Sequence, residues 1–373
     1  MIIYLIGFVW ALGLISRAEK MKNPKIFWSI CIIGILLPSY IAAVRSVGVG
    51  VDTAVYGEVA FKYATRYPLD KYLTFFLNSP LFYTLWYVSS NVFGNIAGAF
   101  FIVEFLIEIS ILSAIVKEVK DEGGSIVRGM AVYYFVFYCY SLNIMRQFMA
   151  LAFIMLIYEY LYKENKIIRY IIGTIILYFV HSTALIGLFI PVLNWLYKRL
   201  ASKSSIKKYA LYLVTMLGVV LCLTFYNRLL EVIVSLEPNF SHYGSTKINV
   251  SGTFTMLFFF VLVSGWEIIC AVILRNRNAN FSYLIYLQII GGGTFLINLF
   301  SNDAYRLSFY FLIFSLPGYS TMLNTNCCSE VAKRDKKILW CVSCVILFVF
   351  WYIVAVKWRV NNTVPYKSNI LGI

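Results

Sequence analysis

The chain has 373 residues, of which 61% are hydrophobic, 18% aromatic and only 13% charged. A soluble domain carries about 25% charged residues, so this chain lacks the polar surface needed to face water on all sides. Its formal net charge of +15 would favour nucleic-acid binding in a soluble protein. Here, however, the basic residues lie between apolar runs, where they set topology and contact anionic lipid. The composition therefore predicts a protein embedded in a lipid bilayer, with no nucleic-acid partner.

Taken in chain order, the apolar runs predict an all-α, polytopic integral membrane protein with about 12 transmembrane helices. The first run begins at Met1 without the basic segment of a cleavable signal peptide, so we expect it to be retained as a span. Residues 79–93 are also apolar, but as a crossing they would invert every later loop, so we expect a re-entrant or surface-lying segment there. The expected spans cover roughly residues 2–16, 26–44, 96–116, 129–143, 147–162, 169–181, 183–197, 209–227, 253–274, 282–300, 306–323 and 338–356.

Short basic connections set the expected orientation. Because positively charged loops stay in the cytoplasm, we expect both termini on the outer face. Residues 1–373 then form a single domain with large outer loops at 45–78 and 228–252. Residues 169–197 are short for two full crossings, so we expect either short helices meeting at a sunken outer cavity or a broken helix that carries His181 and Pro191 into the membrane. Most of the 32 Lys and Arg residues lie in the connections 17–25, 117–128, 163–169, 198–208, 275–277 and 333–337.

This topology places several chemically useful side chains on the same outer face. Arginines at the outer ends of helices are costly and are not explained by the positive-inside rule, so we expect a functional site there. The alternative for each arginine is a helix end whose charge reaches to the membrane interface. The residues concerned are Arg45, Asp52, Arg146, His181, Tyr243, Asp303 and Arg306.

The inventory of metal ligands is poor. The chain has two histidines, His181 and His242, and its outer acidic residues are scattered. A divalent ion on this face would usually need two or more carboxylates. Most of the eight cysteines lie inside apolar runs, where cysteine behaves as a small hydrophobe. We therefore expect no metal and no other cofactor.

Four sequence elements, in order, resemble the EpsG/Wzy-like polysaccharide polymerases. "RSVGVGVDTAVY" from Arg45 resembles their R-x-x-G-x-D-T-x-x-Y element, although Gly48, Gly50 and Gly57 are more glycines than it usually needs. We expect those glycines to give the loop mobility. The other elements are "NIMRQFMALAFIMLIYEYLYKENK…FVHSTAL", "DAYRLSFYF" and the terminal "VPYKS". The resemblance runs from Arg45 to Tyr366 and so covers nearly the whole chain.

The resemblance implies a glycosyltransferase of the bacterial inner (cytoplasmic) membrane that assembles O-antigen of lipopolysaccharide, or exopolysaccharide. In the scheme it implies, the growing glycan is carried on undecaprenyl pyrophosphate. It is transferred at the outer face onto the non-reducing end of a new lipid-linked repeat unit. The resemblance further implies a separate co-polymerase partner that determines chain length.

That chemistry needs fixed cations, because the pyrophosphate leaving group is polyanionic. Arginine suits this task, since its planar fork binds phosphate oxygens in pairs and keeps its charge. We expect Arg45, Arg146 and Arg306 to hold the donor pyrophosphate.

The acceptor hydroxyl must also lose a proton to a nearby base. His181 is the candidate, and Asp52 is its rival. Thr53 is expected to hydrogen-bond Asp52 in a turn, and Asp52 could equally be an Asx-type turn residue or a helix cap.

Other residues are expected in supporting roles. Asp303 can orient Arg306 by a charge pair or cap its helix, and Gln147 follows Arg146 in its motif. Tyr56 and Tyr243 could stack on sugar faces, although tyrosines are also common in the aromatic belt at the membrane interface.

A different class of function stays open from the sequence. Glu104 and Glu108 lie four residues apart in an expected span, and Glu267 lies in another. Intramembrane carboxylates mark functional sites by default. The alternative hypothesis is therefore a flippase for lipid-linked oligosaccharides, or another secondary transporter. Such proteins generally show two related halves, and no halved repeat is visible here.

Overall fold

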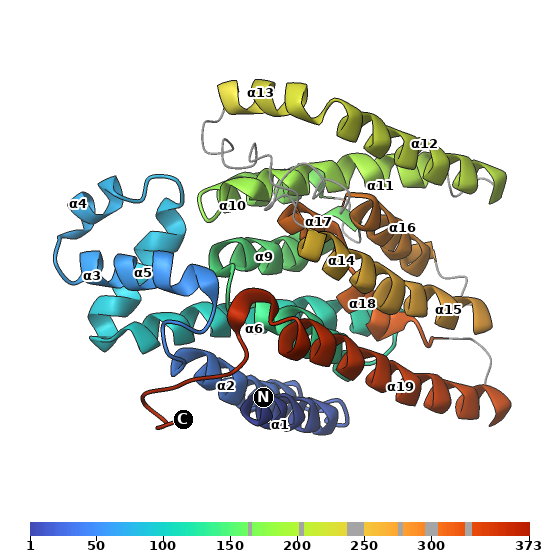
Figure 1. Ribbon diagram of the computed structural model, residues 1–373. Coiled ribbons are helices and arrows are strands. Elements are labelled where there is room, and N and C mark those ends of the chain that lie inside the picture. The colour runs from blue at the N-terminus through green and yellow to red at the C-terminus, as the bar shows by residue number, and fades with distance from the viewer. Residues whose placement is uncertain (163–165, 201–204, 237–249, 275–278, 295–304, 325–329) are drawn as a thin grey trace.

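The computed structural model describes residues 1–162, 166–200, 205–236, 250–274, 279–294, 305–324 and 330–373, and these residues form helices without any strand (Figure 1). The all-α prediction is confirmed for this part of the chain. The helices of the first half are α1 (Ile2–Ala18), α2 (Pro24–Ala43), η1 (Thr53–Glu58), α3 (Val59–Ala64), α4 (Leu69–Thr74), α5 (Pro80–Phe93), α6 (Ile96–Glu122), α7 (Ile126–Val132), η2 (Tyr133–Phe137), α8 (Tyr138–Ser141) and α9 (Met145–Tyr162).

The second half is helical in the same way. Its helices are α10 (Ile167–Tyr178), η3 (Ser182–Leu188), α11 (Phe189–Leu200), α12 (Ser205–Thr224), α13 (Tyr226–Leu236), α14 (Val250–Phe259), η5 (Phe260–Ser264), α15 (Gly265–Ile273), α16 (Ala279–Thr294), α17 (Tyr305–Leu312), α18 (Ser315–Thr321), α19 (Glu330–Trp351), η7 (Tyr352–Lys357) and η8 (Val360–Asn362). The two halves pack as one bundle, with α3, α4 and α5 gathered at one end of it (Figure 1).

Local sequence signals explain where the principal helices begin and end. Asn23 caps α2, because its side-chain oxygen accepts from the backbone N–H of Lys25 at 2.9 Å, and Pro24 occupies the first helical position. Gly94 ends α5 in a left-handed conformation with φ +65. Asn95 then caps α6 by accepting from the N–H of Gly98 at 2.9 Å. These are the residues that helix termini favour.

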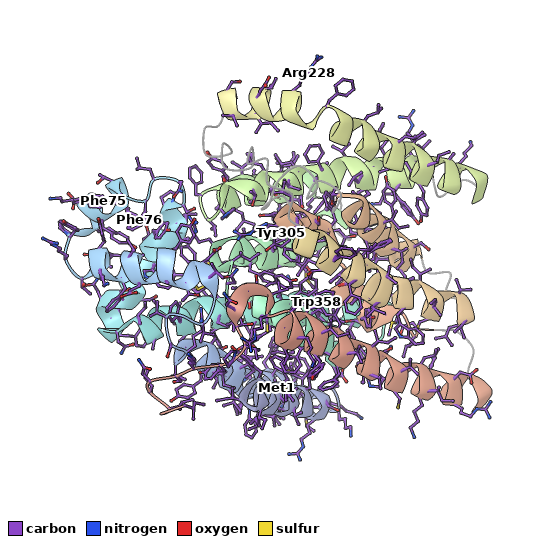
Figure 2. All side chains as sticks on the ribbon, in the orientation of Figure 1. Met1, Phe75, Phe76, Arg228, Tyr305 and Trp358 are labelled. Atoms are coloured by element: carbon purple, nitrogen blue, oxygen red, sulfur yellow. The ribbon has the colours of Figure 1, made fainter. Side chains whose placement is uncertain are left out.

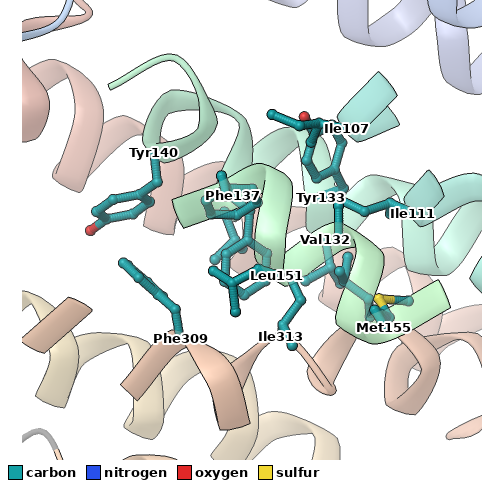
Figure 3. Packing of buried hydrophobic residues seen from close by; sticks show 14 of the residues in the cluster. Ile107, Ile111, Val132, Tyr133, Phe137, Tyr140, Leu151, Met155, Phe309 and Ile313 are labelled. Atoms are coloured by element: carbon teal, nitrogen blue, oxygen red, sulfur yellow. The ribbon is translucent and has the colours of Figure 1, made fainter. Parts of the chain in front are cut away.

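The core is built around α6, which packs against α2, α5, α7, α9 and α18. Aromatic and aliphatic side chains together fill the space between α6, η2, α9 and α17 (Figure 3). The ring of Phe309 lies 4.8 Å from that of Tyr140 and 6.1 Å from that of Phe137, both in edge-to-face geometry. This is the geometry that aromatic pairs prefer, so α17 is fixed firmly against the helices that precede α9.

Three helices are long and apolar enough to cross a membrane, within the described residues: Pro24–Ala43, Ile96–Lys120 and Arg334–Lys357. Shorter apolar helices occur at Ile2–Ala18, Ile167–Tyr178 and Leu257–Ile273. The twelve expected spans all overlap helical segments. The number of crossings and the outward position of both termini stay predictions.

Three expected features have a definite form in the structure. Within residues 79–93, Pro80–Phe93 form the 14-residue helix α5, which packs on α3 and α6; its depth in a membrane stays a prediction. The chain reverses near His181 between two short helices, and Tyr170 of α10 donates to the carbonyl of Gly187 at 3.0 Å. Both expected outer loops contain helices: 45–78 holds η1, α3 and α4, and 228–252 begins inside α13.

The projecting group of α3, α4 and α5 has its own small aromatic core. The ring of Phe76 stacks on that of Tyr83 at 4.1 Å, and the ring of Phe75 lies 4.8 Å from that of Tyr63 (Figure 2). These contacts hold the start of α5 in place, which matters because Ser79 and Tyr83 approach the candidate site.

Candidate functional site

The segment between α2 and η1 folds tightly against the turn that precedes α9. Gly50 has φ +98, and a Cβ atom added there would lie 2.6 Å from the Thr53 Oγ1 and 3.3 Å from the carbonyl oxygen of Leu142. The hydroxyl of Thr53 lies 3.2 Å from that same carbonyl and from that of Val49. Gly50 therefore allows close packing at a backbone conformation that other residues rarely adopt, and the mobility expected of the glycines stays a prediction.

Arg45 points into the protein, with only 5% of its surface exposed. One Nη atom donates to the carbonyl oxygen of Ala42, and the other lies 3.1 Å from that of Leu142 and 3.4 Å from the Met145 Sδ. Its guanidinium also stacks over the ring of Phe100 at 4.2 Å. The structure thus joins Arg45 to the end of α2, to α6 and to the turn before α9.

The C-terminal tail fastens the other side of this segment. The N–H of Ser46 donates to the carbonyl of Lys367 at 2.8 Å, and the hydroxyl of Ser368 donates to that of Val44. The hydroxyl of Tyr366 donates to the carbonyl of Ile41 at 2.8 Å. Burial raises the pKa of Tyr366 to about 12, so the hydroxyl keeps the proton that this bond needs. The "VPYKS" element therefore acts as a clamp on the end of α2.

Asp52 and Arg306 form an ion pair, with 3.2 Å between the Asp52 Oδ2 and the Arg306 Nη1. Neighbouring amides hold both partners in place. The backbone N–H of Asp52 donates to the Asn143 Oδ1 at 2.9 Å, and the Gln147 Nε2 donates to the carbonyl of Arg306 at 2.7 Å. Both charged side chains stay partly exposed, at 18% and 23%. This pair joins the first and third sequence elements of the resemblance, 254 residues apart.

Arg146 lies in the first turn of α9 and is only partly buried. Its guanidinium lies 4.3 Å from the ring of Tyr56 and 5.6 Å from that of Tyr83, and its Nη1 is 3.5 Å from the Ser79 Oγ. Within the described residues, Arg146 forms no salt bridge with a carboxylate. Aromatic rings attract a cation without neutralising its charge, so Arg146 presents a net positive charge.

His181 occupies the N-cap position of η3, in an extended conformation with φ −158. The backbone N–H of Thr183 donates to the His181 Nδ1 at 3.3 Å, and the Thr183 hydroxyl lies 2.7 Å from the same atom. That hydroxyl is 3.0 Å from the hydroxyl of Tyr310 in α17. The Thr183 hydroxyl, the closer of the two groups, can accept from Nδ1, and in that tautomer Nε2 is the basic nitrogen of the neutral ring.

Shared contacts draw Arg146, Arg306 and His181 towards one region. Ser79 lies beside Arg146 and two residues before Leu81. The N–H of Leu81 donates at 3.0 Å to the carbonyl of Phe179, which lies two residues before His181. On the other side, Tyr310 lies one helical turn after Arg306 on the same face of α17. The start of α5, the start of α9, the α10–η3 junction and α17 therefore converge here, while the position of this region on the outer face stays a prediction.

The structure also brings in residues that sequence reasoning did not single out. Ser79 and Tyr83 contact Arg146, and Asn143 orients Asp52 while donating to the Asn361 Oδ1 at 3.1 Å. Thr183 and Tyr310 lie inside the "FVHSTAL" and "DAYRLSFYF" elements, which was the available signal for them. Two expected site residues, Tyr243 and Asp303, lie outside the described residues.

No group of three or more His, Cys, Asp or Glu side chains is placed to hold a metal ion within the described part of the chain. The sequence-based expectation of chemistry without metal or cofactor stays a prediction.

Comparison with known proteins identifies the family. No curated protein and no solved structure matches the chain. The family model of the EpsG family matches residues 25–368, which include all four sequence elements and the contacts of the candidate site. The chain therefore belongs to the EpsG family, a Wzy-like family of polysaccharide polymerases.

Proposed function

We propose that this chain is a glycosyltransferase of the bacterial inner membrane that polymerises lipid-linked repeat units. It would transfer the growing glycan from undecaprenyl pyrophosphate onto the non-reducing end of a new lipid-linked repeat unit, at the outer face. Family membership supports the polymerase activity. The observation that carries the site assignment is Arg146, a cation placed on tyrosine rings without a carboxylate partner among the described residues.

The position of Arg146 is unfavourable unless an anion is bound. The N-terminus of a helix carries a partial positive charge, so an arginine in the first turn of α9 is repelled by it. The same arrangement of cation and helix N-terminus binds phosphate groups well. The donor pyrophosphate is the anion that polymerisation brings to this face, and Arg146 is its proposed first ligand.

Arg306 is the proposed second ligand. Its ion pair with Asp52 uses one Nη atom and leaves the side chain partly exposed. Two arginines near one leaving group bind the pyrophosphate and stabilise the charge that develops as its bond to the sugar breaks. Asp52 then orients Arg306, with Gln147 and Asn143 fixing the backbones of the two partners.

His181 is the proposed base. The acceptor hydroxyl attacks the anomeric carbon of the donor glycan, and a new glycosidic bond forms from the hydroxyl oxygen. The bond between that carbon and the pyrophosphate oxygen breaks, and undecaprenyl pyrophosphate leaves with the electron pair. The proton of the hydroxyl passes to His181, whose ring is oriented by Thr183. Histidine suits this role because its proton affinity lies near neutral pH.

The geometry changes the proposed roles of other residues. The guanidinium of Arg45 bonds protein carbonyls, so we assign it to holding the outer segment instead of the pyrophosphate. Thr53 closes the turn at Gly50, and Tyr56 supports Arg146. A chain-length-determining co-polymerase, no metal and no cofactor complete the proposal.

Deletion of the gene tests the activity, with gel analysis of surface glycan and of lipid-linked intermediates. Loss of a polymerase leaves single repeat units on the surface or lets lipid-linked units accumulate. Loss of a flippase, the alternative function, leaves no repeat unit exposed outside. The first pattern supports the proposal, and the second replaces it with transport.

Complementation of the deletion strain tests the site. Arg146→Ala should abolish polymer while the protein stays at normal level in the membrane. Arg169→Ala is a matched control, because Arg169 also lies over a tyrosine ring, that of Tyr160 at 5.9 Å, but in a connection expected in the cytoplasm. Normal polymer from Arg146→Ala would contradict the assigned site.

A further inference from the structure

Glu267 is a carboxylate that the proposed polymerase site does not use. It lies in α15 and is completely buried. The Gln288 Nε2 of α16 donates to its Oε2 at 2.9 Å. Its Oε1 has no hydrogen-bond partner. A buried carboxylate with one unpartnered oxygen is costly, and such a group within an apolar helix marks a functional site by default.

Further unpartnered oxygens lie on the helices that pack around this carboxylate. The Gln288 Oε1, the Ser264 Oγ and the Ser315 Oγ also have no hydrogen-bond partner, and all three side chains are completely buried. Gln288 contacts Glu267 directly. Ser264 lies three residues before Glu267, which places it on the same face of the helix.

α18 closes the third side of the same space. A Cβ atom added to Gly318 would lie 1.9 Å from the Glu267 Oε1, so this oxygen rests directly on the backbone of α18. Ser315 lies one turn before Gly318, on the same face. The hydroxyl of Tyr319 donates to the carbonyl of Val263 at 3.0 Å, which fixes α18 beside the residues that precede Glu267.

The chemical kind of these atoms indicates what they bind. All four unpartnered atoms at this place are oxygens, whereas elsewhere in the described chain unpartnered nitrogens also occur, for example the Arg45 Nε, the Trp86 Nε1 and the Asn361 Nδ2. Unsatisfied buried groups call for an unseen water or ion. Carboxylate, carbonyl and hydroxyl oxygens are the ligands of hard cations. One carboxylate balances one positive charge, so a monovalent cation leaves the buried site neutral.

We propose that Glu267, Gln288, Ser264 and Ser315 form a buried sodium site that joins α15, α16 and α18. Sodium binding unites three helices, one of which, α16, packs directly on α17, the helix that carries Arg306. Gly318 is required at the site because any side chain there would displace the carboxylate.

Binding of ²²Na⁺ to the purified full-length protein in lipid nanodiscs tests the proposal directly. We expect saturable binding of one ion per chain, displaced by unlabelled Na⁺ and not by choline. Glu267→Gln should abolish it, and Ser315→Ala should weaken it by about tenfold, the loss of one good ligand. Na⁺ should also raise the melting temperature of the wild-type protein, because a ligand of the folded state stabilises it by mass action.

Glu108→Gln is the matched control. Glu108 is equally buried, but Tyr134 and Ser39 donate to its two oxygens at 2.7 and 3.4 Å, so its replacement should leave ²²Na⁺ binding unchanged. If Glu267→Gln fails to fold, the wild-type protein and Ser315→Ala still decide. If the wild-type protein binds no more ²²Na⁺ than empty nanodiscs do, the proposal is overturned, and water or a proton satisfies Glu267 instead. Equal binding in wild type and Ser315→Ala would also overturn it.

Discussion

Arg45 and Arg146 both lie beside the turn that precedes α9, and the fold places them in opposite environments. Arg45 is 5% exposed and spends its donors on the carbonyls of Ala42 and Leu142. Arg146 lies in the first turn of α9, is partly exposed and rests on the rings of Tyr56 and Tyr83. From the sequence, both were expected to bind pyrophosphate.

The difference teaches how this fold separates structure from chemistry. The two Nη atoms of the buried Arg45 guanidinium bond protein carbonyls, as a buried charge requires, so Arg45 stabilises the segment between α2 and η1. An arginine on aromatic rings keeps its charge available to an anion. Mutations at Arg45 or in the C-terminal tail should therefore lower stability, whereas mutations at Arg146, Arg306 or His181 should lower activity.

The largest effect on activity is expected at His181. His181→Asn can still accept from the N–H of Thr183 as an N-cap but cannot serve as a base. Polymerisation should fall by about 100- to 10,000-fold, the usual contribution of a general base. The rate is measured with purified protein and lipid-linked repeat units, and the melting temperature serves as the control for folding. A rate equal to that of the wild type would rule out His181 as the base.

A smaller effect is expected from breaking the ion pair between Asp52 and Arg306. If Asp52 only orients Arg306, Asp52→Asn should lower the rate by about tenfold, equivalent to about 1.4 kcal/mol. The loss should disappear in the background of Arg306→Ala, because residues in contact are not additive. A double-mutant cycle on the rate measures this. Complete loss of activity in Asp52→Asn, together with normal activity in His181→Asn, would make Asp52 the base.

A modest effect on stability alone is expected at the tail. Tyr366→Phe removes the hydrogen bond to the carbonyl of Ile41, which should cost about 1 kcal/mol and lower the melting temperature. Polymer made per folded molecule should not change. A loss of activity without a loss of stability would show that the tail takes part in the reaction site instead of only stabilising the fold.

The smallest effect is expected from chelation. The proposed site uses arginines in place of a divalent ion, so EDTA should leave the polymerisation rate unchanged. Inhibition by EDTA that Mg²⁺ or Mn²⁺ reverses would show that the arginines act together with a metal.

The sequence predicted the helical class and the family from patterns that span long segments. It also singled out Asp52, Arg146, His181 and Arg306 as candidates, because polar and charged residues are conspicuous in an apolar chain. It could not distinguish the structural role of Arg45 from the proposed binding role of Arg146, because each is an arginine within a matched sequence element. Their difference depends on contacts made across long chain separations, such as that of Arg45 with Leu142.

The same limit applies to two other features. Gly50 was expected to provide mobility, but its close approach to Leu142 is a tertiary contact that local sequence does not encode. Asp303, expected to pair with Arg306 or to cap its helix, lies outside the described residues, and the described partner of Arg306 is Asp52, 254 residues away. Partners of charged residues inside a bundle are set by helix packing, which sequence spacing alone does not give.

The central claim is tested most directly by measuring turnover per folded molecule for Arg146→Ala and Arg45→Met side by side. We predict that Arg146→Ala loses about 100-fold or more in turnover, as when a group stabilising transition-state charge is removed, with an unchanged melting temperature. Arg45→Met should lower the melting temperature while each folded molecule retains its turnover. The opposite pattern, with turnover lost in Arg45→Met and kept in Arg146→Ala, would contradict the account.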